Sequence, residues 1–154
     1  MKHDLYPGVV ASPDFNFFEF ISVGRKGNIP KRIAFEPTKW SNVFNLAFGD
    51  ITEDDQIDDL NISDNGDRNK VLVTVVKVVE TYTEKFPDRW IYFAGNTEHK
   101  TRLYRMAISL NLEELSEKFG IYAELKENEA IVPFEKGLNI KGFFVKRKFI
   151  KFEI

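Results

Sequence analysis

The stretch Arg89–Ala107, RWIYFAGNTEHKTRLYRMA, decides the fold. Its apolar start, Trp90–Ala94, is typical of a buried strand, and the Gly95-Asn96-Thr97 that follows predicts a tight turn. A helical pattern comes next, with Thr97 as the expected cap. A strand that leads through a short turn into a helix gathers free backbone N–H groups and the positive end of the helix dipole at one point. This arrangement predicts an anion site.

The segment before this stretch, Arg68–Phe86, predicts a long buried helix. Its valines favour a strand by propensity, but 19 residues are too many for a typical strand. Asp67 is placed to cap the helix, and Pro87 ends it. The apolar residues recur at helical steps of three or four: Leu72, Val75, Val79, Tyr82 and Phe86.

The remaining segments predict strands. Phe15–Pro37 is expected to form a hairpin around Gly24–Asn28, and Val43–Gly49 a third strand. Asn111 is expected to restart the second helix, because Asn111 and Glu114 have the form of a capping box. Shorter or later strands are expected at Ile57–Ile62, Ile121–Leu125, Ala130–Phe134 and Phe143–Phe152.

The resulting fold class is α+β. An N-terminal antiparallel meander of three strands precedes the long buried helix, a central strand, the broken second helix and the C-terminal strands. The helices are expected to pack on a mostly antiparallel sheet. We expect a single domain over residues 1–154, with an irregular arm at residues 1–13.

The composition excludes several classes of protein. The 154 residues include no cysteine, which removes disulfides, thiolate metal sites and cysteine nucleophiles. No signal peptide and no membrane-spanning run is expected, so the predicted location is the cytoplasm. The net charge of −2 argues against a general polyanion binder. The sequence has no P-loop, no dinucleotide-binding glycine pattern and no serine-triad order, so no cofactor is predicted.

The helix start carries a dense set of anion-binding side chains. Arg102 and Arg105 are candidate clamps for a phosphate group, and His99 is a candidate acid or base. His99 is alternatively a partly buried structural residue beside the apolar stripe. The arginines are alternatively ion-paired, Arg102 with Glu98 at i,i+4. The full candidate set is Asn96, Thr97, His99, Lys100, Thr101, Arg102, Tyr104 and Arg105, joined by Asp67 and Arg68 at the start of the other helix.

Charge is distributed unevenly along the chain. From Asp50 to Asp67 there are eight acidic residues and no basic one. The spacing fails the calcium-loop pattern, so no metal site is predicted; a solvated loop, or a docking surface for a basic protein, remains. Lys141–Lys151, KGFFVKRKFIK, mixes basic and aromatic residues. An edge strand protected by lysines is favoured there over a surface for single-stranded nucleic acid.

Five short segments of the chain look familiar together: SVG at 22–24, NLAFGD at 45–50, DNGDR at 64–68 with KVLVTV at 70–75, TRLYRM at 101–106 and VKRK at 145–148. With them, the chain resembles, over Leu5–Lys148, a family of small bacterial proteins known only as a domain of unknown function. The resemblance implies a bacterial, cytoplasmic, single-domain protein, and such proteins are often toxin–antitoxin or defence components. It supplies no catalytic residues.

The sequence therefore predicts binding of a phosphate-bearing ligand, a nucleotide or RNA, at residues 95–105. If the protein is an enzyme, metal-independent phosphodiester chemistry is expected, with His99 as acid or base, Arg102 and Arg105 as clamps and Tyr104 assisting. The alternative is a non-enzymatic interaction module that docks a basic protein through Asp50–Asp67.

Overall fold

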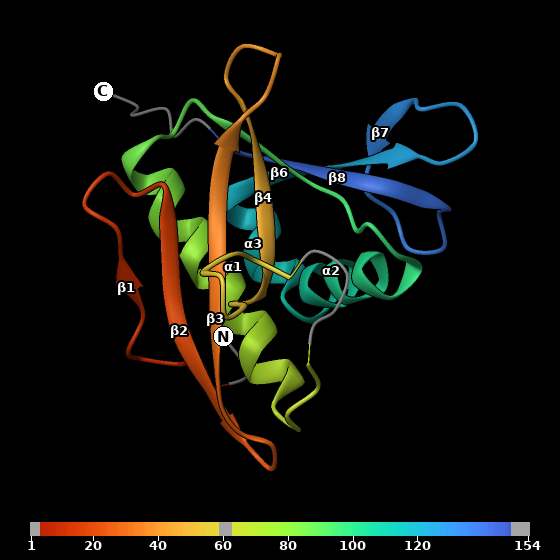
Figure 1. Cartoon of the computed structure of the whole chain (residues 1–154). Helices are drawn as coiled ribbons and strands as arrows, with labels where there is room; N and C mark the ends of the chain where they lie inside the picture. Colours follow the sequence, from red (N-terminus) through yellow and green to blue (C-terminus); the bar gives the residue numbers. More distant parts are fainter. Residues whose placement is uncertain (1–3, 59–62, 149–154) are drawn as a thin grey trace.

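The computed structural model describes residues 4–58 and 63–148 (Figure 1). Three helices pack on one eight-stranded sheet, which confirms the predicted α+β class. The strands are β1 (Val10–Ala11), β2 (Phe17–Gly24), β3 (Gly27–Pro37), β4 (Val43–Asp50), β5 (Trp90–Phe93), β6 (Phe119–Leu125), β7 (Ile131–Pro133) and β8 (Ile140–Arg147). The helices are α1 (Arg68–Lys85), α2 (Glu98–Leu110) and α3 (Leu112–Lys118).

The strands follow the order β1-β2-β3-β4-β5-β8-β6-β7 across the sheet. Every neighbouring pair is antiparallel except β4 and β5, which pair in parallel. A parallel pair needs a crossover connection, and α1 supplies it between β4 and β5. In Figure 1, strands β2, β3 and β4 stand in front of α1, so the helices cover the rear face of this part of the sheet.

The β2–β3 hairpin turns tightly at Arg25 and Lys26, and Gly24 pairs with Gly27. Gly27 has a φ of 90°, a backbone conformation that favours glycine. Alternation along both strands places Phe18 and Phe35 toward the helices, where both rings are buried. The predicted hairpin and the third strand, β4, are confirmed.

Helix α1 is buried along most of its length, which explains its unusually apolar sequence. Its residues face both the sheet and α2, so valines suit nearly every position. Tyr82 is fully buried and stacks on Phe35 of β3, with ring centroids 3.7 Å apart. The backbone N–H of Phe86 donates to the Tyr82 carbonyl and closes the last turn before Pro87.

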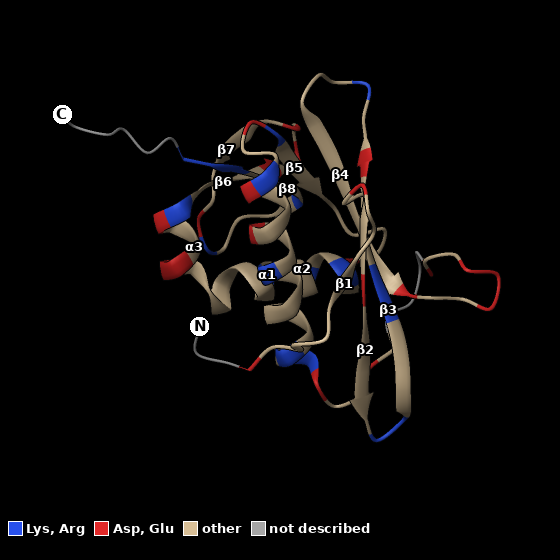
Figure 2. Cartoon of the chain, turned by 90° about the vertical axis from the view of Figure 1, so that its left-hand side faces the viewer, with Lys and Arg blue, Asp and Glu red and all other residues tan. Residues whose placement is uncertain are grey.

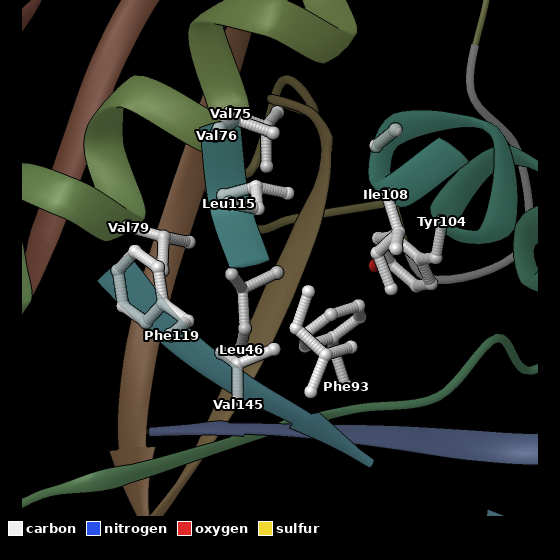
Figure 3. Close-up of a pocket in the computed structure, with 12 residues that line it drawn as sticks. Leu46, Val75, Val76, Val79, Phe93, Tyr104, Ile108, Leu115, Phe119 and Val145 are labelled. Carbon is white, nitrogen blue, oxygen red and sulfur yellow. The ribbon is translucent and has the colours of Figure 1, made fainter. Parts of the chain in front are cut away.

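Helices α1, α2 and α3 and the sheet enclose a cavity of about 40 Å³ (Figure 3). Its lining is wholly apolar, and a buried water needs several polar partners, so we expect the cavity to be dry. It is a packing gap in the core and not a ligand site. The lining includes Leu46, Val75, Val79, Phe93, Tyr104, Ile108, Leu115, Phe119 and Val145.

Both predicted carboxamide or carboxylate caps are wrong in detail. Asp67 stands before α1, but its side chain makes no cap hydrogen bond and instead accepts from Tyr6 and Ser22. Asn111 stands between α2 and α3, yet its Nδ2 donates back to the carbonyl of Ala107, so the capping box is absent. In both cases the side chain that the local sequence pattern assigned to the helix start bonds elsewhere. Asp67 bonds to residues distant in sequence, and Asn111 bonds to the preceding helical turn.

Three strand predictions need correction. The arm predicted as irregular contributes β1, which pairs with β2. The strand predicted at Ile57–Ile62 is a single bridge between Ile51 and Ile57, and the rest of that prediction falls outside the described residues. The last predicted strand begins earlier, at Ile140, and residues 149–152 of it also fall outside them. Most importantly, β8 is no edge strand, because it lies between β5 and β6.

Candidate functional site

A hollow of about 370 Å³ lies where β5 ends and α2 begins. The β6–β7 connection and the segment around the start of β8 form its other side. We call it the basic hollow. It is lined by Gly95, Asn96, Thr97, Glu98, Thr101, Arg102, Arg105, Lys126, Asn139, Ile140 and Lys141.

The turn at 95–97 presents the N-terminus of α2 to the basic hollow. The Thr97 hydroxyl accepts from the backbone N–H of Lys100 (3.2 Å), so the predicted cap is confirmed. Gly95 packs against the helix so closely that a Cβ there would lie 2.3 Å from the Thr101 nitrogen. Only glycine lets the strand end approach the first turn in this way. The positive end of the α2 dipole therefore faces the basic hollow.

Four cationic side chains and one acidic one line the basic hollow. The Arg105 guanidinium donates to the Leu138 carbonyl (3.1 Å), and its buried Nε has no hydrogen-bond partner among residues 4–58 and 63–148. Arg102 is exposed and makes no ion pair with any residue in 4–58 or 63–148. Lys126 lies 3.7 Å from Glu98. Lys141 pairs with Glu129 (3.2 Å), a contact that raises the Lys141 pKa.

The local ion pairs expected for the arginines are not formed among the described residues. Glu98 contacts Lys126 and not Arg102, even though Glu98 and Arg102 have favourable helical spacing. Arg105 donates to a backbone carbonyl near β8 and not to the acidic stretch. Both guanidinium groups therefore keep hydrogen-bonding capacity that an internal ion pair would have used.

The helical periodicity of α2 divides the predicted set among three environments. Asn96, Thr97, Thr101, Arg102 and Arg105 line the basic hollow. Lys100 and Tyr104 are buried on the opposite side. His99 belongs to neither group.

Lys100 and Tyr104 are core residues. The Lys100 ammonium donates to the carbonyls of Phe48 (3.1 Å) and Asp58 (3.4 Å), which ties the acidic segment to α2. The Tyr104 ring packs edge-on against Phe93 and lines the apolar cavity. Neither side chain lines the basic hollow, so the structure does not place them with the two arginines.

His99 is exposed, so the interpretation as a buried structural residue is wrong. It lines a second pocket of about 70 Å³ together with Asp67 and Arg68. The structure therefore places His99, Asp67 and Arg68 together at the starts of the two helices. Arg102 and Arg105 line a different hollow. Asp67 itself accepts hydrogen bonds from Tyr6 and Ser22; burial and the bond to Asp67 raise the Tyr6 pKa.

Much of the acidic stretch is bound within the molecule. The Asp50 carboxylate contacts the buried Lys31 ammonium, Asp55 pairs with Arg32 (2.5 Å), and Asp64 lies 3.7 Å from Arg25. The exposed turn at residues 53–55 projects from the sheet on the side opposite the helices (Figure 2).

Sequence reasoning missed Lys126, Asn139 and Lys141, which complete the basic hollow. Lys126 and Asn139 lie in connections and Lys141 lies in β8, all between 16 and 31 residues beyond the end of α2. They join the basic hollow only because β8 lies next to β5. The basic run beginning at Lys141 is the one signal that pointed to this region.

Comparison with known proteins places the chain in a family. Residues 2–148 match the profile of DUF6934, described as a family of unknown function. The chain belongs to this family. The resemblance predicted from the five sequence segments to a family without assigned activity is confirmed, and the DUF6934 match spans α1, α2 and every strand of the sheet. Searches among curated proteins and solved structures gave no match. Within residues 4–58 and 63–148, no helix is both long and apolar enough to cross a membrane.

Proposed function

We propose that the basic hollow binds the phosphate group of a nucleotide or RNA. The observation that carries this proposal is the Arg105 Nε, which is buried beside the basic hollow and has no hydrogen-bond partner in the part of the chain that the structure describes. A buried donor left unpaired costs about 1–3 kcal/mol. A phosphate oxygen that accepts from this group would remove that cost.

The groups around Arg105 fit the same ligand. Arg102 adds a second guanidinium group. A planar guanidinium can donate two parallel hydrogen bonds to two oxygens of one phosphate. The first turn of α2 adds backbone N–H groups and the positive dipole end. Lys126 and Lys141 add charge without fixed geometry. Their acidic neighbours, Glu98 and Glu129, are exposed, so water screens these pairs and a stronger anion competes for the lysines.

The proposal is for binding and assigns no catalytic step. His99 is the predicted acid or base, and it lines the second pocket with Asp67 and Arg68 instead of the basic hollow. Phosphodiester chemistry at Arg102 and Arg105 would therefore need an acid or base from elsewhere. The predicted toxin–antitoxin or defence setting stays a prediction, which the neighbouring genes would test.

The test is calorimetric titration of the full chain with adenosine monophosphate and with inorganic phosphate. Arg102→Gln and Arg105→Gln should each weaken adenosine monophosphate binding about tenfold, because a charge-assisted hydrogen bond is worth about 1.5–3 kcal/mol. Arg105→Lys should also weaken it, since lysine keeps the charge but lacks the planar fork. Arg25→Gln, at the exposed β2–β3 turn, is the matched control. Equal affinities in the control and in both hollow variants would refute the proposal.

The alternative, docking of a basic protein through Asp50–Asp67, has less support. Among the described residues of the stretch, Asp50 and Asp67 bind groups within the molecule, and the exposed Asp55 and Asp64 lie beside arginines. Glu53 and Asp54 are exposed acids without such a neighbour among residues 4–58 and 63–148. It would gain support if neutralising those two residues abolished capture of a basic protein while adenosine monophosphate binding was absent.

A further inference from the structure

Four aromatic rings form a cluster on the face of β5, β8 and β6 that the helices leave uncovered. The residues are Trp90, Tyr92, Tyr122 and Phe144, and we call them the aromatic platform. In the register of the sheet, Tyr92 lies opposite Phe144, and Phe144 lies opposite Tyr122. Ring centroids are 4.7 Å apart for Tyr92 and Phe144 and 5.5 Å for Trp90 and Tyr122.

The direction of the platform follows from strand alternation. Phe93 and Phe143 stack on each other and face α2, where Phe93 meets Tyr104. The alternating neighbours of these residues, Tyr92 and Phe144, must point to the opposite face. All four platform residues are only half-buried, so ring surface reaches solvent there.

Two glycines make room for the tyrosine rings. A Cβ at Gly142 would lie 2.6 Å from the Tyr92 hydroxyl and 2.8 Å from its ring carbons. A Cβ at Gly120 would lie 3.1 Å from the Tyr122 ring. Each tyrosine ring thus packs against a position that has no side chain. The Tyr92 hydroxyl also donates to Glu124 (2.6 Å), which fixes that ring further.

The aromatic platform adjoins the basic hollow. Gly95 lies two residues beyond the end of β5, and Lys141 precedes Gly142 in β8. Lys126 lies just beyond the end of β6, two residues after Glu124, and its backbone N–H donates to the Asn139 carbonyl (3.0 Å). The platform therefore has cationic groups at the end where β5 enters α2.

A second cation lies on the platform itself. Lys146 shares a face of β8 with Phe144 and is paired in register with Gly120, next to the Tyr122 ring. The mixed basic and aromatic sequence of β8 has no edge-protecting role, because β8 is an interior strand. Aromatic rings that reach solvent beside cationic groups are the combination that binds unpaired bases together with their phosphates.

We propose that the aromatic platform stacks the bases of single-stranded nucleic acid whose phosphate lies in the basic hollow. This inference rests on the proposed function of the basic hollow and names its ligand class. Duplexes are disfavoured, because their bases already stack on one another and cannot lie on protein rings. Single strands expose both the base faces and the phosphates that the two adjoining surfaces require.

The test is fluorescence anisotropy of the full chain with labelled single-stranded oligouridylate of about twelve nucleotides, a length within the range that one such surface covers. Phe144→Leu and Tyr122→Leu keep apolar volume but remove a stacking face. Each should weaken oligouridylate binding about tenfold, the loss expected for one stacked base. Phe17→Leu, at an exposed aromatic of β2, should leave binding unchanged. Phe144→Tyr keeps the ring and should bind nearly as the native chain does, which separates stacking from misfolding.

Phosphate binding distinguishes failure of this inference from failure of the proposed function. The platform variants should bind inorganic phosphate as the native chain does, whereas Arg102→Gln and Arg105→Gln should weaken the binding of both inorganic phosphate and oligouridylate. If phosphate binds but the platform variants have the same affinity for oligouridylate as Phe17→Leu, the inference is overturned and the proposed function stands. Equal affinity for a duplex of the same length, or a dimer that Phe144→Leu dissociates, would also overturn it. Absence of both phosphate and oligouridylate binding would overturn both proposals.

Discussion

Replacing Asp50 by asparagine should destabilise the fold strongly, because it leaves a buried ammonium group without its counterion. Lys31 lies on the helix-facing side of β3 and is only 1% exposed. It is paired in register with Asp50 on β4, and its Nζ contacts the Asp50 carboxylate. Its other acceptor is the Ser63 carbonyl (3.2 Å). So little of Lys31 reaches solvent that bulk water compensates only weakly for the lost carboxylate.

The two halves of this ion pair should not be equivalent. Removing one partner of a buried pair costs about 3–5 kcal/mol, which sets the expectation for Asp50→Asn. Lys31→Met should cost less, about 1–2 kcal/mol, since the Asp50 side chain is 16% exposed and keeps a hydrogen bond from the Ser63 N–H (3.1 Å). The double variant should be close to Lys31→Met, because it carries no unpaired buried charge.

The effect of Asp50→Asn should also depend on pH. Burial alone would raise the Asp50 pKa, but hydrogen bonds from Lys31 and Ser63 outweigh it and lower that pKa below its ordinary value. A lowered pKa in the folded state stabilises the fold above the ordinary aspartate pKa of about 3.9. That contribution is lost as pH falls from there through the lower folded-state pKa.

Urea unfolding followed by circular dichroism, at pH 7 and again near pH 3, measures these free energies. At pH 7 the order of stability should be native chain, then Lys31→Met and the double variant, then Asp50→Asn. The gap between the native chain and Asp50→Asn should narrow near pH 3. A cost below about 1 kcal/mol for Asp50→Asn would refute the reasoning, since it would mean that the Lys31 ammonium finds other solvation.

Three further predictions concern single positions. Burial and the hydrogen bond to Glu124 raise the Tyr92 pKa, so in an alkaline titration at the phenolate absorbance Tyr92 should ionise well above the ordinary tyrosine pKa of about 10. The stability it contributes is complete below that ordinary pKa and is lost as pH rises through the folded-state value. Thr97→Ala should lower the free energy of unfolding by about 1 kcal/mol and Thr97→Ser by much less, as judged by urea midpoints, because the hydroxyl caps α2. Gly24→Ala should destabilise the hairpin, since its Cβ would meet a backbone carbonyl at 2.0 Å, whereas Gly8→Ala meets nothing within 4 Å; equal melting temperatures for these two variants would contradict the packing argument.

The sequence predicted the elements better than their surroundings. Strand and helix types followed from periodicity, and α1 was recognised despite its valines because its apolar residues recur at helical steps. The position of β8 was not predictable from local pattern. Its lysines and arginine suggested an edge strand, but its place depends on pairing with β5, some 50 residues earlier. Local pattern carries no information about such a distant partner.

Only part of the candidate site was predicted, because the rest depends on residues that are distant in sequence. The turn at 95–97 and the cap at Thr97 are local features, and they were found. The division of α2 into a hollow-facing side, a core side and the side that carries His99 depends on what packs around the helix. Lys100 illustrates the limit, because a lysine in a charged run would be assigned to solvent. It is buried since two backbone carbonyls of β4 and the following loop accept from its ammonium group.

The single parallel pair in the sheet has a consequence for folding order. The strands on one side of it, β1 to β4, pair with neighbours in sequence, so they close short loops. On the other side, β5 pairs with β8 across most of the C-terminal half. The β4–β5 pairing that joins the two groups is short and runs over Val43–Asn45 and Trp90–Tyr92. We therefore expect the N-terminal meander to acquire hydrogen-exchange protection first during refolding, and the basic hollow, which needs β8 beside β5, to assemble last.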